Sequence, residues 1–570
     1  MYVQSESIVL HNHLIFHFSS GKNRPNQFSC KSGYTSYESL TDYSYYGRHL
    51  PPNDQAEAGY RPPELLNADL FQMGHKEGEP PALSRVLELF ERKKDSDGRE
   101  QVMCPRSTML FPTFAQHLID SFIVTQVKKD TPDGGTEFDW QRTDTPHDIG
   151  LLPLYGRTFD QTRQLRLCSE RPGDKGRLKS QIINGEEWAP YLYDADGKVK
   201  NEFDKLDLPQ GLEQVFKFDQ DAQKKRKAIF AFGGTRTNLT PNISAWNTLL
   251  LREHNRVAAI IEKNNDPSWD DERVFQVARN VVLVIYLKLV VEEYINHITA
   301  YKTDFTVEPG KWMWNAPWYK RNWISAEFAV LYRWHAIIPN RMQWGEKTPR
   351  TEQSLFDNTL LLSEEGMKGN LRDIFYNICN HRASCMQLHN TEKWMIGRDR
   401  RALEHSRAVN LQSFSSYCEY LGRDVPQAFS DITKDKELQD ELKDVYGDVK
   451  NVEFWVGLIA QDHTPESIMS PTLTQFVAND AFNQALAHPL LSENVWTNGE
   501  DTFSKVGFKI VKENQTIKDI LKRNSQNGAK LEGFVGMTNK DYTLPSDAII
   551  RIGLASVVVG IVSILVKLII

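Results

Sequence analysis

The 570-residue chain has little cysteine, and its six cysteines show neither C-x-x-C spacing nor clustering. They are Cys30, Cys104, Cys168, Cys379, Cys385 and Cys418. This scatter argues against a disulfide module or a zinc site and favours a reducing, cytosol-facing environment. A large excess of one charge is also absent, because the chain has 68 Lys and Arg residues and 75 Asp and Glu residues, spread along its whole length. Nucleic acid and acidic polymers are therefore excluded as partners.

Strand-like alternation, internal repeats and a secretory signal are missing as well. The opening "MYVQSESIVLHNHLIFHF" has no basic start, and histidines interrupt its apolar run. Helical spacing of apolar residues dominates instead, over 108–126, 245–265, 271–301, 326–339 and 451–461. Residues 130–230 read as a surface excursion. The sequence predicts a mainly α fold with long loops.

One long apolar run closes the sequence. Residues 552–566 are 15 uncharged residues between Arg551 and Lys567. As a helix, Ala548 to Ile570 would measure about 35 Å, enough for a hydrocarbon core of about 30 Å. We expect residues 546–570 to form a C-terminal membrane anchor, with a core helix as the alternative.

The segment 326–339, "AEFAVLYRWHAIIP", places a tyrosine and a histidine three positions apart. If it forms one helix ending at Pro339, Tyr332 and His335 share a face and both touch one planar cofactor. A neutral imidazole is a good haem-iron ligand, and a phenol beside the porphyrin could give up an electron. A core aromatic helix with one buried histidine is the alternative.

Further motifs accompany this segment in a fixed order. "TLLLREHNRVAAII", "EEYINHITAY", "GEEWAP" and "VYGDVKNVEFWVGLI" resemble the animal haem peroxidase and cyclooxygenase superfamily, and most closely its prostaglandin-endoperoxide synthase branch. The resemblance runs from about Tyr34 to about Lys518. It implies a haem peroxidase/cyclooxygenase-like catalytic domain over 34–545, preceded by an N-terminal extension over 1–33. The cofactor that it implies is haem b, iron protoporphyrin IX.

The resemblance implies a role for each residue of the central segment. His335 becomes the proximal ligand of the haem iron, with Trp334 beside it, and Tyr332 becomes the tyrosine whose radical takes hydrogen from a fatty acid. Tyr294 corresponds to the tyrosine that hydrogen-bonds the radical tyrosine. Tyr301 corresponds to one at the mouth of the substrate channel.

On the distal side of the haem the chain departs from the synthase pattern. Synthases carry a histidine four residues after a glutamine, whereas here Gln116 is followed by Asp120. His117 cannot replace the histidine, because adjacent helical residues point about 100° apart. A carboxylate binds a proton more weakly than imidazole by about two and a half pH units, so we expect a weak peroxidase activity unless burial raises its pKa. "GGTR" aligns with the peroxidase branch and makes Arg236 a distal cation.

The fatty-acid channel is less defined by the resemblance. His11, Lys22 and Arg24 are the candidates for binding the substrate carboxylate. Ala481 stands where mammalian synthases have a serine, so acylation by salicylate-type reagents is not expected. Two further positions correspond to family sites: Trp455 to a second oxidisable tyrosine, and Glu404 to a polar residue on the proximal side.

The resemblance implies a haem-dependent dioxygenase that adds O2 to a polyunsaturated fatty acid such as arachidonate. The alternatives are a fatty-acid α-dioxygenase or haem peroxidase, and a degenerate haem-binding membrane scaffold. We expect the tail to hold the protein on a membrane, such as the endoplasmic reticulum, with the catalytic domain in the cytosol. The oligomeric state is left open, with a homodimer as one option.

Overall fold

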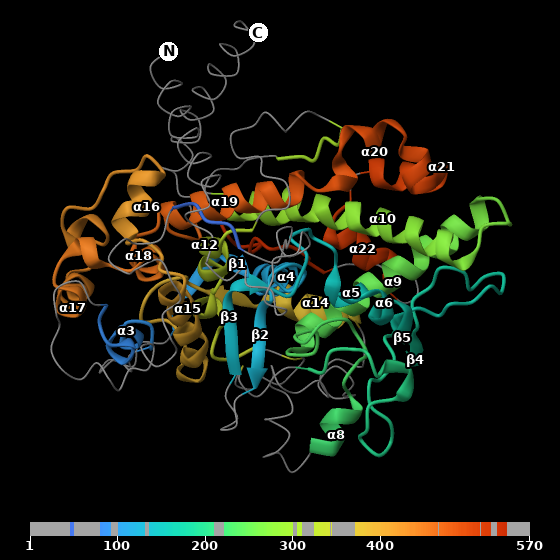
Figure 1. Ribbon diagram of the computed structural model, residues 1–570, viewed down its shortest axis with the longest axis horizontal. Helices are drawn as coiled ribbons and strands as arrows, with labels where there is room; N and C mark the ends of the chain where they lie inside the picture. Colours follow the sequence, from blue (N-terminus) through green and yellow to red (C-terminus); the bar gives the residue numbers. More distant parts are fainter. Residues whose placement is uncertain are drawn as a thin grey trace, which may run out of the picture.

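The computed structural model describes residues 46–50, 80–92, 101–130, 136–209, 222–299, 305–310, 324–342, 344, 351, 371–464, 467–513, 515–525 and 533–543. Helices dominate these residues (Figure 1). The longer ones are α4 (Leu110–Ile119), α9 (Pro241–Asn264), α10 (Asp271–Leu289), α14 (Leu371–Asn380), α15 (Ile396–Ala408), α17 (Lys436–Tyr446), α19 (Pro471–Leu486), α21 (Gly499–Lys512) and α22 (Ile517–Asn524).

Shorter helices connect them. They are α3 (Leu83–Glu88), α5 (Leu152–Tyr155), α6 (Phe159–Leu165), α8 (Ala222–Lys227), α11 (Asn296–Ile298), α12 (Ala326–Leu331), α16 (Phe414–Tyr420), α18 (Phe454–Ala460), α20 (Glu493–Thr497), the π-helix η4 (Val290–Ile295), and the single 3-10 turns η3 (Asn201–Phe203), η5 (His335–Ile337), η7 (Lys393–Met395), η8 (Phe429–Asp431), η9 (Val449–Asn451) and η10 (Pro489–Leu491).

The strands form three two-stranded antiparallel sheets in the described chain. The pairs are β1 (Met103–Thr108) with β6 (Arg382–Ser384), β2 (Thr125–Asp130) with β3 (Thr136–Thr143), and β4 (Gln181–Ile183) with β5 (Glu186–Trp188). The sparse alternation in the sequence predicted so few strands. The prediction of a mainly α fold is confirmed.

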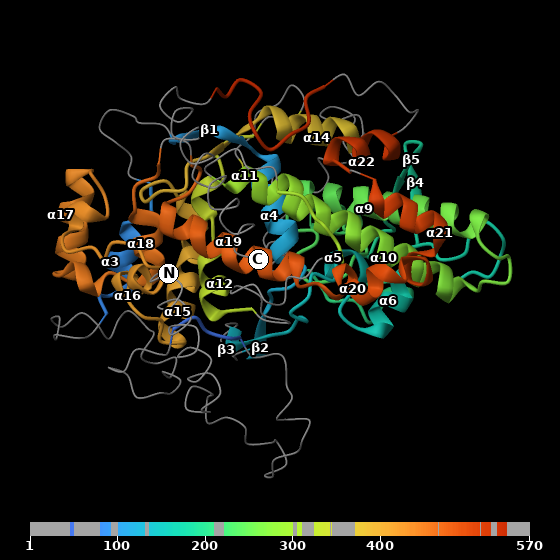
Figure 2. The ribbon, with the colours of Figure 1, turned by 90° about the horizontal axis from the view of Figure 1, so that it is seen from above.

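Helices α9 and α10 lie side by side through the centre (Figures 1 and 2). Both begin where the sequence supplies a side-chain cap: Thr240 accepts a hydrogen bond from the Ile243 amide, and Asp270 accepts one from Arg273. These helices confirm the predictions for 245–265 and 271–301. The second continues through η4 and α11 as far as Ile298. A single π turn inside a long helix often marks a functional site.

Two other predictions need correction. The chain leaves the predicted helix over 108–126 at Ile119 and turns into β2. Residues 130–230 are more than a surface excursion, because Tyr155, Trp188 and Phe230 are fully buried there. Their rings fill the core beside α9, which apolar spacing alone does not reveal in a segment without helical period.

An apolar stretch of the described chain, Asp271–Ile298, has the length and hydropathy of a membrane span. The mean hydropathy of its most apolar 18 residues is 1.8, but 83% of that window is buried inside the protein. A core helix has the same composition, so this segment is weak evidence for a membrane. The predicted C-terminal anchor lies outside the described residues.

An N-terminal segment, residues 46–50, pins the start of α12; we name it the strap. The Gly47 amide donates to the Ile324 carbonyl at 2.7 Å, and the Gly47 carbonyl accepts from the Ala326 amide at 2.9 Å. The amides of His49 and Leu50 donate to one oxygen of the Glu327 carboxylate, at 3.1 and 3.3 Å. Contacts between the strap and α12 therefore join segments about 280 residues apart along the chain.

Candidate haem site

Tyr332 and His335 do not share one helix. Helix α12 ends at Leu331, and both Tyr332 and Trp334 leave the helical conformation, with ψ of 52° and 53°. The Trp334 indole N–H donates to the Leu331 carbonyl at 2.9 Å. That carbonyl is the one that the His335 amide would use in a continuing α-helix. The prediction of a single helix over 326–339 was wrong because a side chain occupies this acceptor.

His335 is held by a buried carboxylate on α15. Its Nδ1 lies 2.6 Å from Oδ1 of Asp399, whose side chain is 2% exposed. Within the described part of the chain, Nε2 has no partner. A carboxylate on Nδ1 holds the proton there and leaves the Nε2 lone pair for a metal, which is the arrangement that orients metal-binding imidazoles.

Sequence reasoning missed Asp399 and pointed to Glu404, one turn further along α15. Glu404 instead lies 3.8 Å from Arg400, and burial raises the pKa of its carboxyl. His335 and Asp399 are 64 positions apart in the sequence, so no local sequence pattern predicts their contact.

The three predicted distal residues lie together at the end of α4. The Gln116 amide donates to both oxygens of the Asp120 carboxylate at 2.9 Å. Arg236 approaches the same carboxylate, with Nε 2.9 Å from Oδ1. Burial raises the pKa of Asp120, while Arg236 and Gln116 oppose that rise. The carboxylate is thus both a stronger base than a free one and tied to a cation.

Two glycines bring Arg236 to this position. A Cβ on Gly233 would lie 2.2 Å from the Leu152 carbonyl oxygen, so only glycine fits there. Gly234 has φ of +78°, a conformation that other residues rarely adopt. The turn then continues to Arg236, whose Nη2 donates to the Ile123 carbonyl at 2.5 Å.

His117 points away from this cluster, as its position in the helix predicted. Its Nδ1 lies 2.8 Å from the Tyr286 hydroxyl and its Nε2 lies 2.9 Å from the Asn247 side-chain oxygen. Burial lowers the pKa of His117 to about 3. It is a neutral packing residue and does not fill the place of Asp120.

Tyr332 lies in an aromatic cluster. Its ring centroid is 4.0 Å from that of Trp334 and 5.1 Å from that of Phe328. Burial raises its pKa, and the neighbouring phenol of Tyr286 adds to the rise. Its hydroxyl has no hydrogen-bond partner among the described residues, so the phenol is dry, neutral and unrestrained at its oxygen.

Tyr294 does not make the hydrogen bond to Tyr332 that the resemblance implied. Its hydroxyl is buried and has no partner in the described chain. Phe111 of α4 stacks on both Tyr294 and Trp334, with centroid separations of 5.7 and 5.8 Å. The two tyrosines thus belong to one aromatic core without a direct bond.

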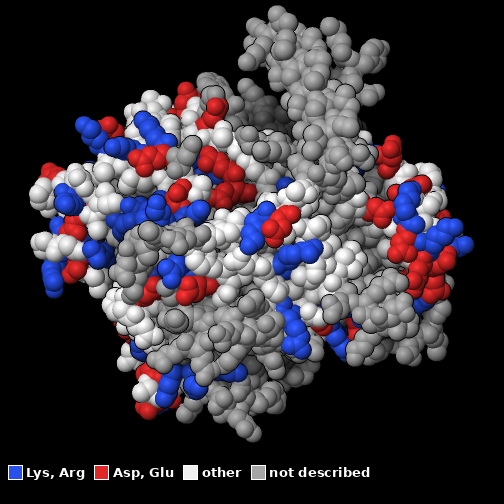
Figure 3. Space-filling view, turned by 180° about the vertical axis from the view of Figure 1, so that it is seen from behind, with Lys and Arg blue, Asp and Glu red and all other residues white. Residues whose placement is uncertain are grey.

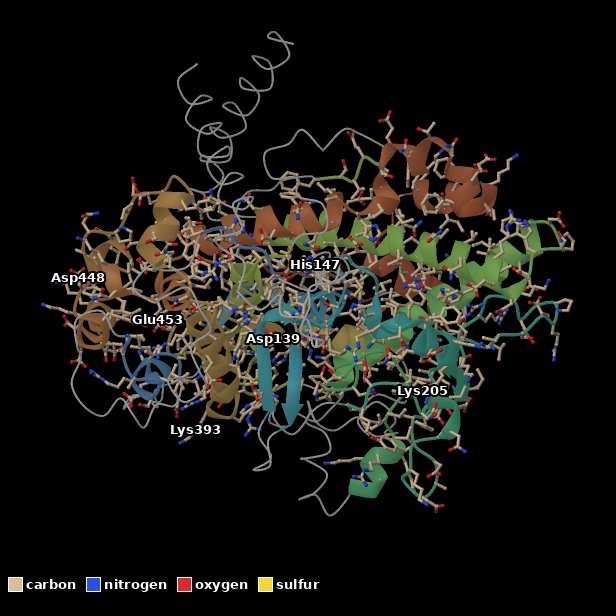
Figure 4. All side chains as sticks on the ribbon, in the orientation of Figure 1. Asp139, His147, Lys205, Lys393, Asp448 and Glu453 are labelled. Carbon is tan, nitrogen blue, oxygen red and sulfur yellow. The ribbon has the colours of Figure 1, made fainter. Side chains whose placement is uncertain are left out.

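The remaining predicted residues are only partly placed. Ala481 is buried on α19, which packs against α12 and η4. Trp455 is buried on α18, stacked on Phe90, and its indole N–H has no partner in the part of the chain described. Arg407 donates two hydrogen bonds to the Glu453 carboxylate at the start of α18, at 2.7 and 2.9 Å. Figure 4 labels Glu453. Four predictions lie outside the described residues: Tyr301, His11, Lys22 and Arg24.

Arg333, between Tyr332 and Trp334, forms no ion pair with any described residue. Its Nε is buried without a hydrogen-bond partner, and no described carboxylate forms an ion pair with it. Burial, with a smaller contribution from the positive charges of Arg236 and Arg401, lowers its pKa to about 10. Asp120 is near, but its oxygens are already taken by Gln116 and Arg236. A buried guanidinium in this state is costly unless a ligand supplies negative charge.

These features define a class of protein. Among the described residues, a helical fold carries an imidazole whose Nε2 has no partner, an aromatic cluster beside it and, in the same segment, a partly buried guanidinium without an ion pair. They fit an iron porphyrin, because imidazole ligates the iron, aromatic rings pack on the macrocycle, and haem bears carboxylates that can meet a guanidinium. The molecule is a helical protein with the residues of a haem site.

Comparison with known proteins supports the conclusion that this is a haem protein. Residues 103–534, most of the chain, match the animal haem peroxidase family, and the chain belongs to it. Prostaglandin G/H synthase 2 of Equus caballus is 28% identical over 490 residues, covering 85% of this chain and 72% of that protein. Prostaglandin G/H synthase 1 of Mus musculus is also 28% identical, over 491 residues with the same coverage.

Solved structures show the same fold. Peroxidase A from Dictyostelium discoideum aligns with a TM-score of 0.63 at 18% identity, over 87% of this chain and 95% of that one. Fatty acid alpha-dioxygenase of Oryza sativa aligns with a TM-score of 0.63 at 15% identity, over 88% and 84%. The predictions of the family, the helical fold and haem as the cofactor are confirmed. As a member of this family, the protein is an oxidoreductase.

Proposed function

We propose that the protein is a haem-dependent fatty-acid dioxygenase that uses a radical on Tyr332 to oxygenate a polyunsaturated fatty acid such as arachidonate. The observation that carries the proposal is the state of Tyr332, a buried phenol with no hydrogen bond at its oxygen, three residues from His335. The relatedness to prostaglandin G/H synthases supports the choice of substrate class.

When bound, haem would supply the oxidising equivalent for the one-electron oxidation of Tyr332. His335 would hold the iron through Nε2, and Asp399 fixes the imidazole by accepting the Nδ1 proton in a hydrogen bond. Tyr332 releases its phenolic proton when it is oxidised. Its oxygen then takes a hydrogen atom from an allylic carbon of the substrate, and O2 adds to the carbon radical. The unbonded hydroxyl leaves the oxygen open to that C–H bond.

The matched experiment replaces Tyr332 by phenylalanine. Tyr332→Phe keeps the ring packing but cannot form a phenoxyl radical, so we expect normal haem absorbance and loss of oxygen uptake on arachidonate. Tyr191→Phe is the control, because Tyr191 stacks on Phe230 and bears no relation to the haem residues. Full oxygen consumption by Tyr332→Phe would end the proposal.

The choice of fatty acid separates this function from α-oxidation. A polyunsaturated chain supplies weak allylic C–H bonds, whereas an α-dioxygenase attacks next to the carboxyl group and needs no double bond. We expect oxygen uptake on arachidonate and none on palmitate. Uptake on palmitate with a product shortened or oxygenated at the α carbon would favour the α-dioxygenase alternative. Haem absorbance without uptake on either would favour a scaffold.

We also propose a weak peroxidase half-reaction at the Gln116, Asp120 and Arg236 cluster. A pocket lined by Asp120, Arg236 and the Gly234–Thr237 turn opens there and would admit a hydroperoxide. Arg236 can polarise the peroxide, and the Asp120 carboxylate can accept its proton. Because the Asp120 carboxylate already forms an ion pair with Arg236 at 2.9 Å, its ability to accept that proton is limited.

Membrane attachment through residues 548–570 is a further part of the proposal. Its support is the uninterrupted apolar composition between Arg551 and Lys567, since each buried apolar side chain contributes about 1.5 to 3 kcal/mol on leaving water. The catalytic domain would then face the cytosol.

A further inference from the structure

Two of the six cysteines meet on the short sheet of β1 and β6. In this antiparallel pair Met103 lies opposite Ser384, and the Ser384 hydroxyl donates to the Met103 sulfur at 3.6 Å, so these two share one face. Side chains alternate along a strand, which places Cys104 and Cys385 together on the other face as diagonal neighbours. Their thiol groups hydrogen-bond each other. The scatter of cysteines along the sequence hid this contact.

The backbone around both cysteines is held in place. The Cys385 amide donates to the Val102 carbonyl at 2.8 Å. The Asn390 side-chain amide donates to the carbonyls of Val102 and Cys385 at 3.0 and 2.8 Å, and the Arg382 Nε donates to the Cys104 carbonyl at 2.9 Å. These hydrogen bonds fix the backbone on both strands beside the two cysteines.

The two thiols differ in ionisation. The hydrogen bond from Cys385 lowers the pKa of Cys104 to about 6, against the opposing effect of burial, and the Ser107 amide also donates to the Cys104 sulfur, at 3.4 Å. The same contact raises the pKa of Cys385. At neutral pH the pair is one thiolate and one thiol, which is the combination of a nucleophile with a second sulfur beside it.

Other described cysteines lack this arrangement. Cys379 and Cys418 are buried, and burial raises the pKa of each, to about 12 and about 11. Cys168 is exposed, and its Sγ lies 3.7 Å from the Arg163 carbonyl oxygen, with no second thiol. Cys385 is only half-buried, so a small oxidant can reach the pair from its side.

We propose that Cys104 and Cys385 form a hydroperoxide-sensitive dithiol that closes to a disulfide. The Cys104 thiolate attacks the peroxide: an S–O bond forms, the O–O bond breaks, and the departing oxygen takes a proton to leave as an alcohol. The Cys385 sulfur then attacks the Cys104 sulfur, forming S–S and breaking S–O. The hydroxide that leaves joins the Cys385 proton as water. Two thiols and one hydroperoxide give one disulfide, one alcohol and one water.

The disulfide would be a labile one. Diagonal neighbours on paired strands lie about 7–8 Å apart at Cα, whereas unstrained disulfides need about 4.4–6.8 Å. Closing the bond would strain this hydrogen-bonded strand pair, and strained disulfides are readily reduced. Since β1 leads directly into α4, the closure acts at the base of the helix that carries Gln116 and Asp120.

The test uses the full-length holoenzyme and cumene hydroperoxide as the probe. Reduced protein is oxidised, its free thiols are blocked with N-ethylmaleimide, and peptides are analysed by mass spectrometry. We expect a peptide pair joined through Cys104 and Cys385 that dithiothreitol separates. Azide, which ligates haem iron, is expected to leave the linkage unchanged because the thiolate attacks the peroxide directly; loss of the linkage under azide would overturn that mechanism.

Three cysteine-to-serine variants test which sulfur atom attacks the peroxide. In Cys385→Ser the Cys104 sulfenic acid should persist and be captured by dimedone, whereas in Cys104→Ser no sulfenic acid should form at Cys385. Cys168→Ser is the matched control, expected to keep the linkage at the wild-type level. Two blocked thiols at Cys104 and Cys385 after peroxide exposure, or a linkage that involves Cys168, would refute the dithiol.

Discussion

At the scale of single residues, Asp399 decides how His335 would present its imidazole. A carboxylate on Nδ1 makes the ring more electron-rich than an amide or a water would. Asp399→Asn keeps the shape of the side chain and removes the charge. We expect haem to bind, the iron–histidine stretching frequency to fall in resonance Raman spectra, and turnover to fall by about 10–100-fold.

Glu404→Gln is the matched control for Asp399→Asn, since Glu404 lies on the same helix and pairs only with Arg400. We expect Glu404→Gln to leave the iron–histidine stretching frequency at its wild-type value. An equal shift in both variants would show that α15 as a whole, and not the Asp399 contact, determines the band.

Arg333 provides a second prediction at this scale. If its guanidinium meets a haem carboxylate, Arg333→Gln should weaken haem binding by about 10–100-fold, because charge-assisted hydrogen bonds are worth about 1.5–3 kcal/mol. Titration of apoprotein by Soret absorbance measures this. With haem dimethyl ester, which has no free carboxylates, the variant and the wild type should bind alike. Arg400→Gln, at a half-buried position on α15, is the control, and an equal loss for haem and its ester would contradict the assignment.

At the scale of elements, α4 delivers Gln116 and Asp120 on one face of a single helical turn. Asp120→His restores an imidazole there and should raise peroxide turnover with a phenolic reductant by at least about 10-fold. The same change breaks the buried pair with Arg236, so the melting temperature should fall. Asp144→Asn, in the same pocket, is the control and should leave turnover unchanged. Wild-type rates already equal to those of histidine-bearing relatives would show that Asp120 suffices.

The elements also show where sequence reasoning reaches its limit. Helices α9 and α10 are predictable because apolar period and caps at Thr240 and Asp270 are local signals. The end of α12 is not, because it depends on the Trp334 indole taking the Leu331 carbonyl. Family motifs pointed to Gln116, Asp120 and Arg236, and the side chains of these three residues do lie together. Asp399 and the Cys104–Cys385 contact escaped because each joins segments that no local spacing relates.

At the scale of the whole molecule, the charge distribution gives no indication of a strongly charged partner. On the face shown in Figure 3, Lys and Arg are interspersed with Asp and Glu. This agrees with a net charge of −7 over 570 residues. The membrane proposal therefore depends on apolar composition alone and not on electrostatic attraction to lipid headgroups.

Removal of Ala548 to Ile570 tests that proposal. The matched family region ends at residue 534, so the truncated protein should keep its haem absorbance and oxygenase activity. Full-length protein should stay in the pellet after carbonate extraction, and the truncated protein should appear in the supernatant. Replacing Val557 by lysine is a milder variant that should release the protein in the same way. Full-length protein in the supernatant would refute the anchor.

The strap has a consequence for the order in which the molecule is assembled. Residues 46–50 emerge early in synthesis, yet several of their hydrogen bonds are to Ile324, Ala326 and Glu327, which follow almost 280 positions later. Closing so long a loop costs roughly 5 kcal/mol of chain entropy, and contacts of such separation form slowly. We therefore expect the start of α12 to be fixed after α9 and α10 have formed. Haem insertion next to His335 is then expected to follow the docking of the strap.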